Sequence, residues 1–387
     1  MTAANLPQGW TWEGVLGRLE QHADLERSAR EQGAIVRVRV IRTAAQLLRL
    51  VLAYVLSGLS LRSTAAWAEA AGEASLSDVA LLKRLRRCGP WLAELVGTLG
   101  AAVNPEASCG DAGRRIVAVD ATAICSPGGK HKGYRLLHTV YDVGAQRFRS
   151  TQVTDRSVAE RLDAGSIEKG EIRLGDKIYG RYRDLAAVSG AGADYVVRLS
   201  ANALKLKTVN GKPLQRAALC KRAEREGIQD MVVQICDNQG RAPLEARLIV
   251  LALPPVQAEA ARRLMRKNAR KARYTPSAEA LVTAGCVMLV TSLDPKSWPA
   301  SRVLDLYRRR WQAELAFKRL KSLLDLEQLR AFDAALVNAW IHAVLLVALL
   351  IELERPSTDA EAPDSPRSAR GHELFPCGAS SPSSLAA

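Results

Sequence analysis

A single acid stands among basic side chains in residues 307–321, which read YRRRWQAELAFKRLK. The stretch holds six Lys and Arg residues, and its one carboxylate is Glu314. At roughly 100° per residue, four of its side chains would point within about 60° of one another on a continuous helix. They are Tyr307, Arg310, Glu314 and Lys321. An ion pair between Arg310 and Glu314 is a common helix feature, so this face alone carries little information.

Two further acids follow short apolar segments earlier in the chain. RRIVAVDAT (114–122) and EIRLGDKIY (171–179) each predict a strand, with Asp120 and Asp176 at the downstream ends. Strand ends are where an α/β sheet gathers its functional groups. A lone acid in such a place is more often a turn former. The functional interpretation therefore depends on all three acids meeting.

Three converging carboxylates would suit a divalent metal ion. Mg²⁺ is a hard cation that takes oxygen ligands, and Mn²⁺ suits the same oxygens. Two such ions about 3.5–4 Å apart activate a water on one side of a phosphodiester and stabilise the leaving oxygen on the other. We therefore expect Asp120, Asp176 and Glu314 to hold Mg²⁺, with the neighbouring cations binding the flanking phosphates.

The overall charge of the chain agrees with a nucleic-acid partner. The 387 residues carry a formal net charge of +15 at pH 7, and the sequence pI is about 9.7. A solvated basic surface is the alternative, but Lys and Arg cluster along several segments, which favours a polyanion, nucleic acid before membrane. The hydrophobic share of 48% is ordinary for a globular protein with a sizeable core.

The cysteine, histidine and hydropathy patterns argue against a zinc-binding, disulfide-rich, secreted or membrane protein. The seven cysteines include no C-x-x-C pair and the five histidines form no ligand array with them, so we expect neither a zinc site nor a disulfide framework. A reducing bacterial cytoplasm fits best, and the polar opening MTAANLPQGWTWEG does not resemble a signal peptide. The most apolar run, 335–353, is interrupted by Asn338 and His342, which predicts a buried helix and no membrane partner.

The pattern of the first hundred residues predicts helices. Apolar residues recur at helical spacing in 43–59, and Ser60 opens a second helix that Gly72 closes. A third helix, 77–87, follows a serine cap and exposes basic residues. Two short helices around a Gly turn suggest a helix-turn-helix-like DNA-binding unit. A small helical bundle with a solvated face is an equally good interpretation.

The periodicity then changes to that of a mixed α/β sheet. The predicted strands are 114–122, 134–143, 147–155, 171–179 and 194–200, and the predicted helices are 157–168 and 181–189. Three strands in meander, followed by alternating helix and strand, imply a mixed α/β fold class. This arrangement would place the two aspartates in one sheet.

Residues 201–285 do not continue this alternation of helix and strand. Asn-Gly and Gln-Gly turns between alternating segments predict a small β-rich unit. It ends in a basic helix, 258–273, whose seven Lys and Arg residues favour phosphate contact over a merely solvated face. A buried strand, 286–293, follows, and Pro299 then starts a long helix that contains the 307–321 stretch.

The spacing Tyr307-x2-Arg310-x3-Glu314-x6-Lys321 resembles the Y-R-E-K motif of the DDE transposases of bacterial insertion sequences, insertion-sequence family four. Four specified residues at fixed spacing make this a fairly specific signal. The likeness extends over roughly residues 25–350.

The two aspartates fit the same resemblance. VDAT around Asp120 is similar to the family's first-aspartate strand, and LGDKIYG around Asp176 is similar to its second, although the family often has Arg where Lys177 stands. Asp176 follows Asp120 by 56 residues, and Glu314 follows Asp176 by 138. The second interval suits the β-rich insertion that these transposases carry before the catalytic glutamate.

The resemblance implies a fold and a division into domains. The catalytic core would be ribonuclease-H-like, formed by residues 114–200 and 286–353, with the β-rich insertion at 201–285. Residues 1–103 would form a helical DNA-binding domain, and 354–387 a disordered tail rich in Pro, Ser and Ala.

The resemblance also implies an activity. Asp120, Asp176 and Glu314 would be the catalytic, metal-binding triad. The enzyme would nick double-stranded DNA at the terminal inverted repeats of its element, and the freed 3′-hydroxyl would attack the opposite strand and later the target DNA. Catalysis would take place in a homodimeric synapse, on protein bound to the nucleoid.

The Y-R-E-K residues would contact DNA near the transposon end. Arg310 and Lys321 would give charge-assisted hydrogen bonds to phosphates. Tyr307 would either join them or serve as a core aromatic residue.

One difference from the family leaves a second function possible. Family members continue through a longer helical C-terminal part, whereas here the apolar helix runs into the tail that starts at 354. A truncated or frameshifted end is therefore expected, and the alternative function is a catalytically inactive, transposase-derived DNA-binding protein acting as a repressor. A structure-specific ribonuclease-H-like nuclease is a third reading, with less need for the insertion.

Overall fold

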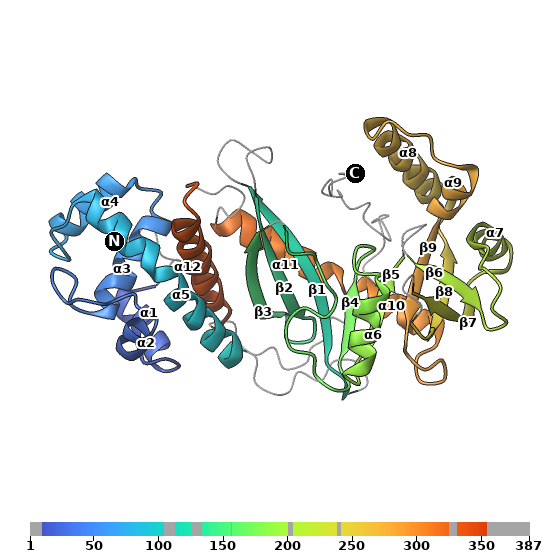
Figure 1. Cartoon of the computed structure of the whole chain (residues 1–387), viewed down its shortest axis with the longest axis horizontal. Helices are drawn as coiled ribbons and strands as arrows, with labels where there is room; N and C mark the ends of the chain where they lie inside the picture. The colour runs from blue at the N-terminus through green and yellow to red at the C-terminus, as the bar shows by residue number, and fades with distance from the viewer. Residues whose placement is uncertain are drawn as a thin grey trace, which may run out of the picture. The chain divides into compact units, whose positions relative to one another are not determined.

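The computed structural model describes residues 10–103, 113–125, 134–155, 157–199, 204–237, 241–324 and 331–353 (Figure 1). The chain forms two compact units. Unit 1 draws on Met1–Glu160 and Gln312–Thr358, and unit 2 draws its described part from Arg161–Trp311. The tail at 354–387 and the turn at 126–130 lie outside the described residues.

Unit 1 opens with helices that begin at polar caps. These are α1 (Trp12–Glu20), α2 (Leu25–Glu31), α3 (Ala44–Leu56), α4 (Leu61–Ala70) and α5 (Asp78–Val103). The side chains of Thr11, Asp24, Thr43 and Ser60 each accept a hydrogen bond from the backbone N–H three residues on. Each cap satisfies one of the N–H groups that a helix start leaves unpaired. The helices predicted from 43, 60 and 77 are confirmed.

Helix α5 runs well past the predicted end at residue 87 and contains Pro90. The continuation is driven by burial, because Trp91, Leu92, Leu95 and Leu99 lie at helical spacing and none exposes any surface. Packing of this stripe outweighs the backbone hydrogen bond that proline removes.

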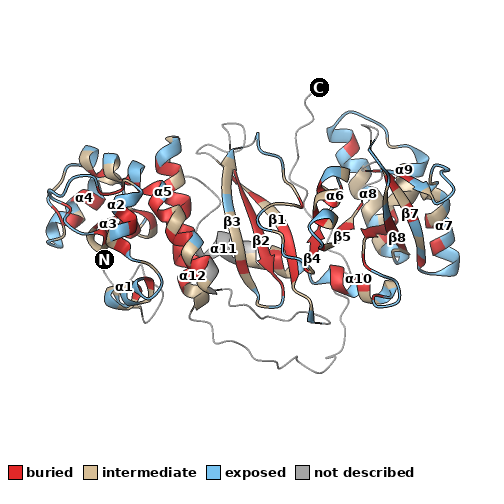
Figure 2. Cartoon of the chain, turned by 60° about the horizontal axis from the view of Figure 1, so that its bottom comes forward, coloured by how far each residue is buried: buried red, intermediate tan, exposed pale blue. Residues whose placement is uncertain are grey.

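Helix α12 (Ala334–Leu353) is the buried helix that the apolar run predicts (Figure 2). Its length and hydropathy would suffice to cross a membrane, but 78% of its most apolar window is buried within the protein. It packs on α5 and α3, and the contact with α5 is tight at Gly89, where a Cβ atom would lie 3.0 Å from Asn338 Nδ2. Burial lowers the pKa of His342, whose Nδ1 lies 2.8 Å from the Asn338 carbonyl.

The sheet of unit 1 is an antiparallel meander in the order β3-β2-β1. Its strands are β1 (Ile116–Cys125), β2 (Tyr134–Asp142) and β3 (Arg147–Asp155). The prediction that Asp120 ends its strand is wrong, since Asp120 pairs with Thr139 in the middle of β1. The strand continues because pairing with β2 extends to Cys125 opposite Tyr134.

The sheet of unit 2 has the order β4-β5-β9-β8-β7-β6. Its strands are β4 (Ile172–Gly175), β5 (Asp194–Arg198), β6 (Lys205–Thr208), β7 (Gln229–Cys236), β8 (Leu244–Ala252) and β9 (Cys286–Thr291). β4 and β5 are parallel and the other neighbours are antiparallel, so the predicted mixed α/β fold is confirmed. The strands of segment 201–285 continue this sheet, because β8 pairs with β9.

Helices accompany this sheet in the expected order. They are α6 (Tyr182–Gly190), α7 (Arg216–Glu226), α8 (Pro255–Lys271), α9 (Ala278–Ala284) and α10 (Ala300–Arg308). The predicted helix 181–189 is confirmed as α6, and the predicted basic helix 258–273 as α8.

The helix expected at 157–168 is absent, and a buried arginine accounts for the difference. Arg173 on β4 has no exposed surface. Its guanidinium donates to the carbonyls of Leu162 (2.8 Å), Ala164 (2.7 Å) and Ser166 (2.6 Å), and to Glu171 Oε1 (2.6 Å). The carbonyls that a helix would use internally are turned toward Arg173 instead.

The long helix expected from Pro299 is also wrong, because it breaks into α10 and α11 (Trp311–Leu324). At the break, the N–H groups of Arg309 and Arg310 bond to carbonyls three residues back, those of Leu306 and Tyr307, both at 3.1 Å. This tighter turn ends α10. The single face inferred for the Y-R-E-K residues therefore does not exist as one helix surface.

Replacing the buried guanidinium should strongly destabilise unit 2. In Arg173→Met the carboxylate of Glu171 and three carbonyls lose their donor inside the protein, and we expect the free energy of unfolding to fall by about 3–5 kcal/mol. Urea unfolding followed by tryptophan fluorescence measures this change. The control is Arg222→Ala on α7, whose ion pair with Glu226 is exposed and should contribute at most about 1 kcal/mol. Equal losses in the two variants would contradict the role given to Arg173.

Candidate active site

Asp176 stands directly after β4, at the strand end where the sequence predicts it. Its Oδ1 accepts a hydrogen bond from the backbone N–H of Ile178 at 2.7 Å, and its carbonyl accepts one from Tyr179 at 3.2 Å. These two bonds form a tight turn that fixes the carboxylate at the carboxyl end of the sheet.

The residue before Asp176 has to be glycine for lack of space. A Cβ atom on Gly175 would lie 2.9 Å from Leu162 Cδ1 and 2.9 Å from Tyr179 Cβ. Leu162 belongs to the loop that Arg173 holds, and Tyr179 is 1% exposed. The turn that carries Asp176 is therefore packed from both sides.

Arg198 is a neighbour of this site that the sequence reasoning missed. In the parallel register of β4 and β5, Gly175 pairs with Val197. Asp176, directly after β4, and Arg198, the last residue of β5, therefore lie side by side at the carboxyl ends of these two strands. The signal was available, because both residues directly follow short apolar runs in alternating strand and helix segments.

Tyr307 and Arg310 join the same neighbourhood from the end of α10. The tyrosine side chain is buried, with 4% exposed. The Arg310 guanidinium donates a hydrogen bond to the Tyr307 hydroxyl, and its carbon lies 5.7 Å from the ring centroid. Burial raises the pKa of Tyr307 and the Asp176 carboxylate raises it further, while the charges of Arg310 and Arg198 oppose both. Burial favours the core-aromatic reading of Tyr307.

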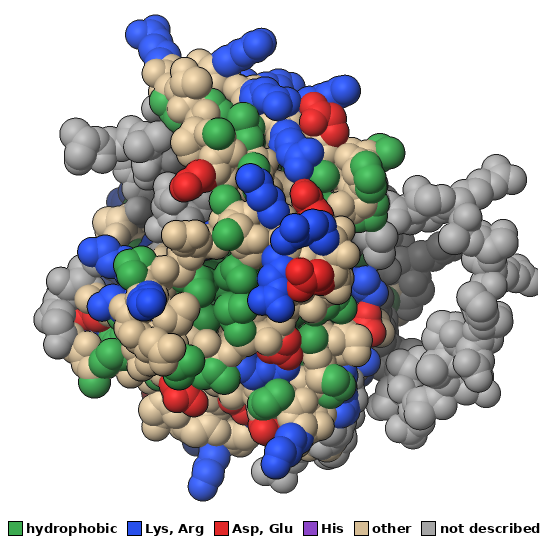
Figure 3. Space-filling model, turned by 90° about the vertical axis from the view of Figure 1, so that its right-hand side faces the viewer, with side chains coloured by type: hydrophobic (Ala, Val, Ile, Leu, Met, Phe, Trp, Pro, Cys, Tyr) green, Lys and Arg blue, Asp and Glu red, His purple; other side chains and the backbone are tan. Residues whose placement is uncertain are grey.

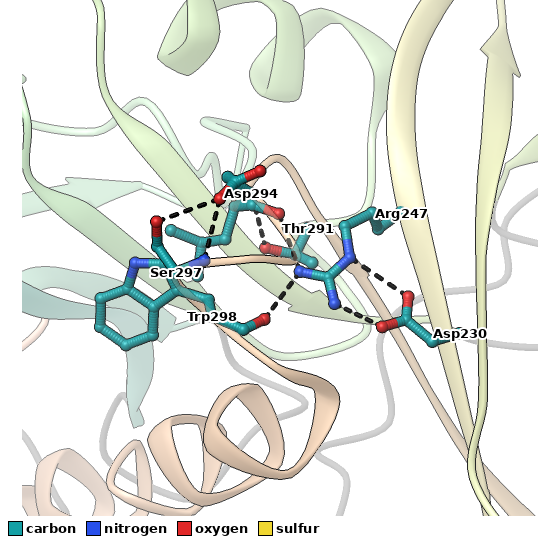
Figure 4. A network of polar contacts seen from close by, with 7 residues as sticks. Asp230, Arg247, Thr291, Asp294, Ser297 and Trp298 are labelled. Carbon is teal, nitrogen blue, oxygen red and sulfur yellow. Dashed lines mark hydrogen bonds and ion pairs between the residues drawn. The ribbon is translucent and has the colours of Figure 1, made fainter.

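A second buried arginine sets where α10 begins (Figure 4). Arg247 on β8 donates to the carbonyls of Leu293 and Trp298, both at 2.9 Å, and forms an ion pair with Asp230. Within the same loop, Asp294 Oδ2 accepts from the N–H of Ser297 at 2.9 Å and from its hydroxyl at 3.0 Å. The connection from β9 to α10 is thereby fixed, and with it the start of the helix that carries Tyr307.

The other predicted site residues belong to unit 1. Asp120 is half-buried on β1, and its Oδ1 accepts the N–H of Ala121 at 2.9 Å. Glu314 is half-buried in the first turn of α11. Lys321 lies on α11, but its side chain is outside the described part of the structure.

The chemistry of the three carboxylates fits a hard cation. Among the residues that the structure describes, no three His, Cys, Asp or Glu side chains lie close enough to hold one metal ion. Asp120 and Glu314 belong to unit 1 and Asp176 to unit 2. The shared metal site therefore stays a prediction. Asp176, Arg198, Tyr307 and Arg310 are the predicted and missed residues that unit 2 brings together.

The chain that carries these residues is similar to known transposases over most of its length. The family model described as "Transposase DDE domain" matches residues 111–350. The chain is 41% identical over 354 residues to the putative transposase InsL for insertion sequence element IS186A of Escherichia coli K12, covering 90% of this chain and 95% of that protein. It is equally similar, over 355 residues, to the transposase for insertion sequence element IS421 of Escherichia coli. The transposase for IS231F of Bacillus thuringiensis subsp. israelensis is 25% identical over 232 residues, 54% of this chain.

Adding one methyl group at Gly175 should disturb the turn that carries Asp176. In Gly175→Ala the new Cβ must displace Leu162 or Tyr179, and we expect the free energy of unfolding to fall by about 1–3 kcal/mol. Thermal or urea unfolding measures the change. Gly190→Ala at the end of α6 is the matched control, because its Cβ would meet nothing within 4 Å and alanine favours helix. A Gly175→Ala variant as stable as this control would show that the close packing is not present in solution.

Proposed function

Because the chain belongs to the family of DDE transposases of insertion sequence elements, we propose that it nicks DNA at the terminal inverted repeats of such an element and transfers the freed strand. Transposases of this family are phosphoryl-transfer enzymes that act on DNA, and the mixed α/β fold agrees with a ribonuclease-H-like core. The single observation that carries the proposal is the 41% identity over nearly the whole length of two insertion-sequence transposases.

We assign the catalysis to Asp120, Asp176 and Glu314. All three fall within the matched residues 111–350, and carboxylate oxygens are the ligands that Mg²⁺ or Mn²⁺ prefers. When bound, such ions would supply the activated water and the stabilised leaving oxygen of phosphodiester cleavage. The role of the protein's own residues is to hold the acids in place. The turn at Asp176 and the pairing of Asp120 within β1 are suited to that task.

The Y-R-E-K spacing supports a finer assignment to insertion-sequence family four. Arg310 and Lys321 are proposed to bind phosphates near the transposon end. Tyr307 is proposed to act through Arg310, because its buried ring and hydroxyl hold the guanidinium in position. Arg198, at the same sheet edge as Asp176, adds positive charge to this neighbourhood.

The wider organisation follows from the same proposal. Residues 114–200 and 286–353 would form the catalytic core, 201–285 the insertion, and 1–103 the part that recognises DNA. Two copies would hold the two ends of the element in a synapse, and the protein would work in the bacterial cytoplasm on the nucleoid.

Neutralising any of the three acids should abolish nicking while DNA binding persists. With terminal-repeat DNA and Mg²⁺, we expect Asp120→Asn, Asp176→Asn and Glu314→Gln each to lower the nicking rate by about 100-fold or more, the loss that follows removal of one electrostatic group from a reacting centre. Single-turnover cleavage on gels measures the rate, and a mobility shift without metal measures binding.

The matched control for these acids is Asp305→Asn on α10, an exposed carboxylate paired with Arg308 at 2.6 Å. It should nick like the wild type. If the wild type binds the DNA and does not nick it, the repressor reading is favoured. If the three variants nick normally, the catalytic residues lie elsewhere.

Removing the Arg310 charge should weaken binding to the element's end. One lost phosphate contact lowers the slope of log affinity against log salt concentration by about 0.9, and we expect this for Arg310→Ala. Tyr307→Phe should give a smaller loss, because the ring stays and only the hydroxyl that accepts from Arg310 is gone. Fluorescence anisotropy over a salt series measures both. Arg308→Ala is the control, and an equal effect there would mean that only overall charge matters.

A further inference from the structure

Helix α8 carries cations that the packing of unit 2 does not use. Its inner side is occupied, because Ala258 and Ala269 are buried. Arg262 reaches inward as well, donating to the Leu281 carbonyl at 3.2 Å and pairing with Glu224 on α7 at 3.5 Å. Further along the helix, Arg263 and Arg266 both pair with Glu259, at 3.4 and 3.2 Å. The cations of the helix as far as Arg266 are therefore all paired with acids.

The cations after Arg266 have no such acid beside them among the described residues. Lys267, Arg270, Lys271 and the following Arg273 are exposed, and among the described residues none of their side chains has a hydrogen bond or ion pair. We call these four residues the α8 cation surface. Figure 3 shows Lys and Arg side chains gathered at the top of this face, the height at which α8 lies in Figure 1.

Helix stability alone does not explain so many charges. One cation near a helix C-terminus is favourable, because it offsets the negative end of the helix dipole. However, Lys267 stands three residues before Arg270 and four before Lys271, and like charges at these spacings destabilise a helix by a few tenths of a kcal/mol each. A bound polyanion would relieve that repulsion.

Other exposed lysines in the same unit have a structural explanation. Lys205, Lys207 and Lys212 lie on or beside β6, the edge strand of the sheet. Lysine on an edge strand prevents pairing with another chain. The α8 cation surface is on a helix and protects no edge, so this explanation does not extend to it.

We propose that the α8 cation surface binds the phosphate backbone of double-stranded DNA as a second contact, separate from the residues of the 307–321 stretch. The inference rests on the proposed function, which makes DNA the polyanion that this protein meets. From Lys267 to Lys271 the helix rises about 6 Å, close to the rise of two base pairs, about 3.4 Å each, along the axis of a DNA duplex. Tyr274, 54% exposed beside Arg273, extends the same surface.

The test compares two triple variants that remove the same charge. Lys267→Ala/Arg270→Ala/Lys271→Ala removes three of the four cations, and Lys205→Ala/Lys207→Ala/Lys212→Ala removes three lysines from the edge-strand region. Each binds a terminal-repeat duplex and an unrelated duplex, without divalent ions, over a salt series. We expect the slope of log affinity against log salt to fall by about 2–3 in the α8 variant and to stay near the wild-type value in the control.

The two duplexes locate the contact. A loss on both means that the α8 cation surface binds backbone regardless of sequence, as on target or flanking DNA. A loss on the terminal repeat alone means that it follows the bound transposon end. Wild-type slopes in the α8 variant, or equal losses in both variants, would overturn the proposal.

The measurement does not depend on catalysis. Because no divalent ion is present, the slopes are read even if the wild type fails to nick DNA, so failure of the proposed function and failure of this inference are distinguishable. Unfolding curves for both triple variants show whether a loss of binding reflects a loss of fold.

Discussion

Two buried guanidinium groups fix the segments that carry the candidate site residues of unit 2. Arg173 donates to three carbonyls and to the Glu171 carboxylate in the segment before β4. Arg247 donates to two carbonyls of the connection after β9 and pairs with Asp230 on β7. Arginine can do this because it presents several donors in a fixed plane. A buried guanidinium whose donors are satisfied is tolerated, whereas one that loses its acceptors is strongly unfavourable. The segment before β4 and the connection after β9 are therefore each held in one backbone conformation by an arginine.

The two arginines act on the same small region. The loop held by Arg173 contributes Leu162, which packs against Gly175 and limits where the Asp176 turn can lie. The connection held by Arg247 fixes the start of α10, and thereby places Tyr307 at its end. Burial and the Asp176 carboxylate raise the pKa of Tyr307 while the two nearby arginines oppose that shift, so the hydroxyl is kept as a neutral partner for the Arg310 guanidinium. The neighbourhood of Asp176 and Tyr307 thus depends on one arginine close to Asp176 in sequence and on another, Arg247, that is distant from both.

Local signals in the sequence were sufficient for most elements but not for these connections. The caps at Ser60 and Ser77, the strand 147–155 and the acid after β4 follow from propensity and short-range pattern. The burial of Arg173 could not be predicted, because an arginine that alternates with apolar neighbours is typical of an exposed strand position. Its acceptors also come from the segment 157–168, whose composition predicts a helix. Asp120 was misplaced because the strand end is set by pairing with β2. Whether the three acids meet is a long-range property that no local pattern contains.

The break between α10 and α11 changes the physical reason for an acid in the basic stretch. On one continuous helix, Glu314 would have been a carboxylate between two cations on a shared face. Because the chain turns at Arg309 and Arg310, a new helix begins at Trp311, and Glu314 falls in its first turn. The N–H groups of a helix start and the helix dipole favour negative charge there, so an acid is the residue type that this position prefers. The spacing of Arg310 and Glu314 then reflects a turn followed by a helix start, with the arginine in the turn and the acid in the first turn of the next helix.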